Sequence, residues 1–120
     1  MSLTFHSLNL NNADRLRNWH GPETIPWIGS DWSNAMCGEA GEAANVVKKL
    51  RRIETNTYRG TKKTDGDIGH LIMLLERELA DTVIYADLLA EFYGLSLGDN
   101  VVAKFNAVSL RENLPQRLQY

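Results

Sequence analysis

The sequence predicts an all-α fold, a bundle of four to five helices. Apolar residues recur at helical spacing in two long segments, 31–53 and 67–93. Both segments lack proline, and residues typical of helix boundaries flank them. No β-rich region and no internal repeat is present, so the helices must form the core.

The N-terminal half predicts two helices and a loop. A short helix is expected over 11–19, capped by one of the two asparagines that open it. The second helix is expected over 31–53, with Ser30 or Asp31 as its cap. The polar segment 54–67 is expected to be a long loop or a hairpin-like excursion, which in a compact domain is often functional.

The C-terminal half predicts two further helices. The third helix is expected over 67–93, and Gly94 suits its C-terminal end. The fourth is expected over 97–112, opened by a capping box that starts at Ser96. Pro115 prevents its continuation, and the tail that follows is expected to be extended.

Length and composition indicate one domain that spans residues 1–120. The net charge of −2 gives no sign of stable nucleic-acid binding. The single cysteine, Cys37, excludes an intrachain disulfide and indicates a reducing compartment, so a cytoplasmic location is expected. We see no signal peptide and no apolar run that approaches the length of a membrane span.

The second helix carries two acids where apolar residues are expected. Glu39 falls in the middle of the face that includes Val46, Val47 and Leu50, and Glu42 falls on its edge. A glutamate on an apolar face is unfavourable unless it has a partner. Two glutamates three residues apart project side by side and would repel each other unless a cation lay between them.

The third helix repeats this arrangement. Glu78 lies at the centre of its apolar stripe and Asp81 at the edge, whereas Glu76, Asp87 and Glu91 fall on the opposite face, where we expect them to be solvated. If the two helices pack face to face, four carboxylates meet.

Four inward carboxylates predict a metal site. Oxygen-only ligands favour Mg²⁺, with Mn²⁺ as a substitute. Such a cluster can hold about two Mg²⁺ ions and suits the transfer of a phosphoryl or nucleotidyl group to water. The alternative is a set of structural acids paired with arginine or lysine.

Other polar residues are candidates for substrate binding. Lys49 lies two helical turns after Glu42, and Asn45 lies on the same side, so both could approach a bound phosphate. Lys104 and Arg111, seven residues apart, flank the buried stripe of the fourth helix. The alternative for each cation is a solvated surface position.

Aromatic residues are candidates for contact with a base. Tyr85 follows Asp81 by one turn, and Trp27 and Trp32 precede the first acid pair. Core packing, or packing between subunits for the tryptophans, is the alternative role.

The acid pairs resemble a family signature. Glu39-x-x-Glu42 followed by Glu78-x-x-Asp81 resembles the E-x-x-E … E-x-x-D pattern of the MazG-like all-α nucleoside triphosphate pyrophosphohydrolases, related to dimeric dUTPases and dCTP pyrophosphatases. The stretch 38–44 looks like the GE-x-GE-x-x core of that family. The resemblance covers about residues 30–112.

The resemblance implies hydrolysis of a nucleoside triphosphate between its α- and β-phosphates, with Mg²⁺, to a monophosphate and pyrophosphate. It implies a role in nucleotide-pool sanitising and a helical dimer or tetramer whose partner subunit helps to complete the site. Lys104 looks like a lysine that relatives carry on the following helix, and Tyr85 like a tyrosine of dCTP-hydrolysing relatives.

Two other functions remain open from the residues. One is a non-catalytic helical dimerisation module with a structural metal site. The other is a carboxylate-metal enzyme that acts on a different phosphate ester or diphosphate.

Overall fold

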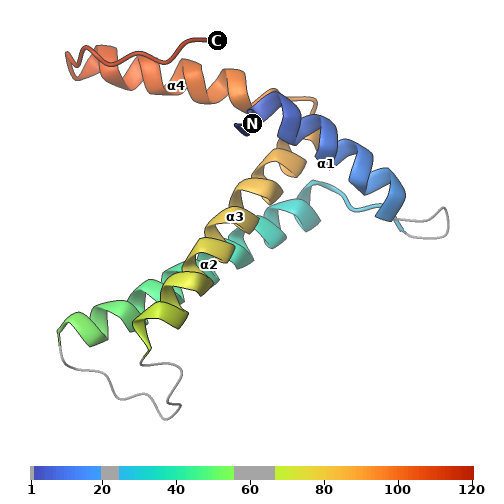
Figure 1. The fold of residues 1–120 in the computed structure, drawn as a ribbon. Coiled ribbons are helices and arrows are strands. Elements are labelled where there is room, and N and C mark those ends of the chain that lie inside the picture. The colour runs from blue at the N-terminus through green and yellow to red at the C-terminus, as the bar shows by residue number, and fades with distance from the viewer. Residues whose placement is uncertain (1, 20–24, 56–66) are drawn as a thin grey trace. The chain divides into compact units, whose positions relative to one another are not determined.

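The structure, a computed structural model, describes residues 2–19, 25–55 and 67–120 (Figure 1). These residues form four α-helices and no strand, which confirms the all-α prediction. The helices are α1 (Phe5–Trp19), α2 (Gly29–Glu54), α3 (Ile68–Phe92) and α4 (Leu97–Arg111). None of the four combines the length and the apolar character that crossing a bilayer requires.

The chain divides into two compact units. We call Ser30–Ala86 the hairpin unit, and Met1–Gly29 together with Asp87–Tyr120 the terminal unit. The helix α3 is continuous and contributes to both units. The predicted acid pairs all fall within the hairpin unit.

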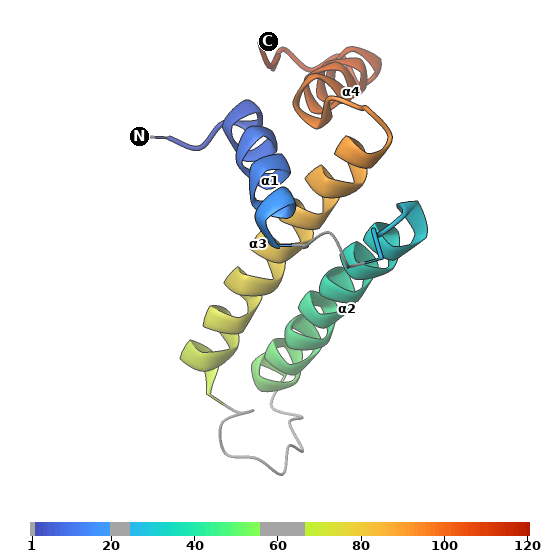
Figure 2. The ribbon, with the colours of Figure 1, turned by 90° about the vertical axis from the view of Figure 1, so that its right-hand side faces the viewer.

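In the hairpin unit α2 and α3 run antiparallel, side by side in both views (Figures 1 and 2). Their contact buries Trp32 and Val46 of α2 and Leu71 of α3, as their helical spacing requires. Val47, expected on the same face, is instead exposed, because it lies about 100° further around the helix than Val46. Most of the predicted loop, residues 56–66, lies outside the described residues.

The first helix begins earlier than predicted, at Phe5. The Ser7 amide donates to Thr4 Oγ1 (3.0 Å), and the Thr4 amide donates to Ser7 Oγ (3.2 Å). This is a reciprocal capping arrangement with serine in the place of the usual glutamate. Thr4 therefore caps the helix, and the asparagines expected to do so lie inside it.

One of those asparagines has a tertiary role. Asn12 is 3% exposed, and its side-chain amide donates to Oδ2 of Asp87 (2.9 Å). Asp87 is only 1% exposed, so the prediction that it is solvated was wrong. Helical periodicity placed it on a polar face, but α1 covers that face through Asn12, and a contact across 75 residues leaves no local signal.

The predicted boundary between α3 and α4 is confirmed. Gly94 has a φ of 68°, and the Leu95 amide donates to the Ala90 carbonyl (2.9 Å), which together form a Schellman-type helix end. Ser96 then caps α4 by accepting from the Asp99 amide (3.3 Å). Two helices thus meet with very few intervening residues.

The C-terminal tail is held against α4. The helix ends at Arg111, before Pro115, because Asn113 adopts a φ of 56° and closes it. Asn106 then donates through its amide to the Leu118 carbonyl (2.9 Å) and accepts from the Leu118 amide (2.8 Å). One side chain therefore pairs with the backbone of the tail as a neighbouring strand would.

Gly98 is required by a close approach of α1. A Cβ at this position would lie 2.8 Å from Cβ of Phe5, which is fixed to the backbone and cannot turn away. We predict that Gly98→Ala lowers the free energy of unfolding by about 1–3 kcal/mol. Gly41→Ala is the control: nothing lies within 4 Å of its Cβ, so it should raise stability by about 0.5–1 kcal/mol. Urea denaturation measures the free energy of unfolding of both variants, and equal effects would contradict the close contact between Gly98 and Phe5.

Candidate metal centre

The two helices of the hairpin unit bring the predicted carboxylates together. Glu39 and Glu42 lie on adjacent turns of α2, and Glu78 and Asp81 on adjacent turns of α3. Carboxylate oxygens of Glu39, Glu78 and Asp81 lie within 4.8 Å of one another. Glu39 and Glu78 are half-buried. Face-to-face packing of the acid stripes therefore produces a cluster that neither helix could make alone.

The fourth acid lies beside this cluster. Glu42 is exposed, and its carboxylate is outside the three-oxygen group. It nevertheless interacts with Glu78: the pKa of Glu42 is raised above 4.5, chiefly by a hydrogen bond between the two carboxyl groups, then by the charge of Glu78, by burial and by the charge of Asp81. Glu42 is therefore placed to exchange a proton near the cluster.

Glu78 is the most constrained of the four. Its pKa is raised above 4.5, first by a hydrogen bond with Glu39, then by burial and by the charges of Glu39 and Asp81, while its contact with Glu42 acts in the opposite direction. Oε2 of Glu78 is buried, and no hydrogen-bond donor from the described part of the chain reaches it. Only a proton, a water molecule or a cation can then satisfy this oxygen.

The donor set fits a hard divalent cation. All three groups offer carboxylate oxygen, which Mg²⁺, Mn²⁺ and Ca²⁺ prefer to nitrogen or sulfur. Oxygens bound to one such ion lie at most about 4–5 Å apart, because each is about 2.0–2.6 Å from the ion. The spacing of the cluster is thus close to what one ion requires, and the unsatisfied oxygen of Glu78 would be a ligand for it.

The aromatic candidates lie along the same helix contact. Trp32 precedes Glu39 by two turns, and Tyr85 follows Asp81 by one turn. Their ring centroids are 6.2 Å apart and their planes are inclined by 40°. Trp32 is only 5% exposed, so its packing role is evident, while Tyr85 is half-buried.

The polar candidates are distributed over both units. Asn45 is exposed and Lys49 half-buried on α2, beyond the acid pair. Lys104 and Arg111 are exposed on α4, in the terminal unit, and the Arg111 guanidinium donates to Glu112 (2.8 Å). The hairpin unit therefore contains the acids, the two aromatic rings, Asn45 and Lys49, whereas Lys104 and Arg111 belong to the terminal unit.

Comparison with known proteins gave no match. No protein-family model, no curated protein and no solved structure is similar to this chain at a significant level. The class of the protein is therefore inferred from the cluster, its neighbours and the sequence pattern.

The raised pKa values predict how stability depends on pH without metal. Below about pH 4.5 Glu42 and Glu78 are protonated in both the folded and unfolded chain. As the pH rises above about 4.5, the two glutamates ionise first in the unfolded chain, which lowers the free energy of unfolding. This loss continues until the pH passes the raised pKa values of the folded protein. We expect metal-free Glu78→Gln to lose less stability than the parent protein between pH 4.5 and 7, measured by thermal unfolding with chelator. An identical pH dependence would contradict the crowding of these carboxylates.

Proposed function

We propose that this protein is a Mg²⁺-dependent nucleoside triphosphate pyrophosphohydrolase of the MazG-like kind, which converts ribo- or deoxyribonucleoside triphosphates to the monophosphate and pyrophosphate. The observation that carries the proposal is the three-carboxylate cluster with its buried, donor-free Glu78 oxygen. The resemblance of both acid pairs to the family signature supports the same reaction. A role in nucleotide-pool sanitising follows from that reaction class.

The residues divide the chemistry between them. Glu39, Glu78 and Asp81 would hold the metal, with Mn²⁺ as a substitute for Mg²⁺. When bound, the metal neutralises polyphosphate charge and makes a water molecule more acidic. Glu42, beside the cluster and with a raised pKa, accepts a proton from the attacking water at its carboxylate.

Substrate recognition would use the neighbours of the cluster. Tyr85, half-buried against Trp32, offers an aromatic edge for the base. Lys49 and Asn45 lie on the α2 side beyond Glu42, where a cation and an amide suit phosphate oxygens. Lys104 and Arg111 of α4 are further candidates for the phosphates.

The apolar surface of α3 supports an oligomer. Leu79 is 53% exposed and Val83 44% exposed, and together with Ile72 they form a stripe on the face of α3 turned away from Glu78. Exposed apolar side chains grouped on one face of a helix mark a surface at which another protein chain can pack. We infer that the protein works as a homodimer or homotetramer in which helix packing covers such surface.

Pyrophosphate release tests the proposed activity. A panel of ribo- and deoxyribonucleoside triphosphates with Mg²⁺ should yield monophosphate and pyrophosphate, and a chelator should stop the reaction. Glu39→Gln, Glu42→Gln and Asp81→Asn should each lower kcat/KM by about 100-fold or more while far-UV circular dichroism stays unchanged. The control is Glu76→Gln, which changes an exposed acid on the same helix as Asp81 and should retain activity.

The outcomes separate the competing functions. Diphosphate and phosphate as products would indicate a different phosphate-ester or diphosphate hydrolase. No release from any triphosphate, with Mg²⁺ still raising the melting temperature, would indicate a helical module with a structural metal. Full activity in the acid variants would refute the assignment of the site.

The oligomer has its own test. Leu79→Glu places a charge in the middle of the apolar α3 stripe and should shift the protein toward the monomer in analytical ultracentrifugation. Arg77→Glu, on the same helix and already charged and exposed, is the matched control and should leave the mass unchanged. A parent protein that sediments as a monomer at all concentrations would contradict the inference.

A further inference from the structure

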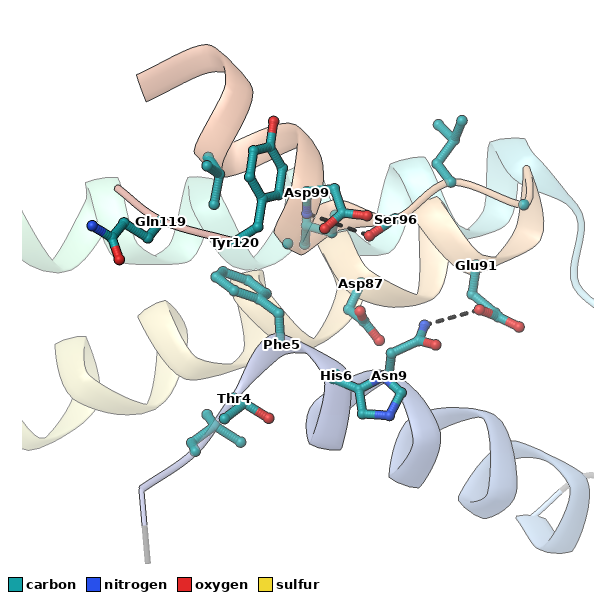
Figure 3. A pocket seen from close by; sticks show the side chains of 16 residues that line it. Thr4, Phe5, His6, Asn9, Asp87, Glu91, Ser96, Asp99, Gln119 and Tyr120 are labelled. Carbon is teal, nitrogen blue, oxygen red and sulfur yellow. Dashed lines mark hydrogen bonds between the residues drawn. The ribbon is translucent and has the colours of Figure 1, made fainter. Parts of the chain in front are cut away.

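A cavity of about 770 Å³ lies in the terminal unit, apart from the acid cluster of the hairpin unit (Figure 3). The start of α1, the last turns of α3, the turn into α4 and the end of the tail form its walls. This volume is in the range of pockets that hold small molecules.

The lining of the cavity is strongly one-sided in charge. Three carboxylates line it, those of Asp87, Glu91 and Asp99, and no lysine or arginine is among the described residues that do so. Among the described residues of the lining there is one histidine, His6. Glu91 accepts a hydrogen bond from the neutral Asn9 amide (2.8 Å), which leaves its charge uncompensated.

Asp87 gives this lining a feature that surface acids lack. It is 1% exposed, and Asn12 donates to Oδ2, but no donor from the described residues reaches Oδ1. Figure 3 shows its carboxylate among the side chains that line the cavity, on the side of His6 and Asn9. A deeply buried carboxylate needs more than one neutral amide to offset its desolvation, and the cavity is the route by which a further donor can reach it.

The position of these carboxylates at the C-terminal end of α3 is a second reason why a cation would bind favourably. Asp87 and Glu91 belong to the last two turns of α3, where the helix dipole disfavours negative charge. No basic residue occupies the last turn of this helix. A bound cation would offset both the unfavourable interaction with the helix dipole and the repulsion between the Asp87 and Glu91 carboxylates.

The walls indicate what kind of cation fits. The rings of Phe5 and Tyr120 line the cavity with Val102, so an apolar stem and a charged head would both find complementary surface. We propose that this cavity binds a small aliphatic amine, with its ammonium group on the Asp87 and Glu91 carboxylates. This site is independent of the proposed hydrolase activity.

Calorimetric titration of the whole chain, with chelator present, tests the site. Putrescine, a four-carbon diamine, should bind saturably, whereas butanediol, of the same length but neutral, should not. Glu91→Gln should weaken putrescine binding by about tenfold, because a charge-assisted hydrogen bond is lost. Glu112→Gln, an acid of the same unit outside the cavity, and Glu78→Gln in the hairpin unit should leave it unchanged.

A second variant keeps the test decisive if one substitution perturbs folding. Asp99→Asn, at an exposed position of the cavity, should also weaken binding, while its circular dichroism spectrum remains that of the parent. Equal binding of the diol, loss of putrescine binding in Glu78→Gln instead of Glu91→Gln, or no saturable binding up to about 10 mM would overturn the proposal.

Discussion

The hairpin unit depends on one constraint: the negatively charged carboxylates of α2 and α3 are held close together within an apolar helix contact. The contact between α2 and α3 buries Trp32, Val46 and Leu71, and the same contact forces carboxylates of both helices within 4.8 Å of one another. Apolar burial favours closing the pair, and repulsion among the acids opposes it. Raised pKa values at Glu42 and Glu78 are the direct expression of this conflict. A divalent cation bound by the acids would reduce this repulsion without loss of any apolar contact.

The sequence was sufficient to predict what depends on local chemistry. Helical periodicity and capping residues predicted an all-α chain, the Gly94 helix end and the Ser96 cap, and each is confirmed. The same periodicity placed Glu39, Glu78 and Asp81 on the facing sides of their helices, which is why their grouping could be expected from spacing alone. These features repeat within a few residues, so a single sequence contains the information.

Predictions failed where the deciding contact leaves no recognisable pattern in the sequence around it. Asp87 lies on the polar side of α3, and its burial follows from Asn12, 75 residues away. The start of α1 was missed because Thr4 and Ser7 cap it with an unusual pair that resembles ordinary polar sequence. Asn106 is similar: nothing local to it indicates that its side chain will hold the tail at Leu118. Side-chain to backbone pairing of this kind is specified by tertiary structure.

The number of ligands bears on whether the metal would be structural or catalytic. In zinc proteins a structural site closes the coordination shell with protein groups, whereas a catalytic site leaves a position open, and Mg²⁺ ordinarily keeps several water ligands. Mg²⁺ takes about six oxygens, and Glu39, Glu78 and Asp81 each offer one in the observed cluster. Oxygens of water or of a phosphate group would have to supply the remaining ligands of such an ion. Glu42 lies beside this group instead of inside it, so its carboxylate could accept a proton next to the cluster. Three clustered acids with a fourth beside them support the proposed hydrolysis over a purely structural metal.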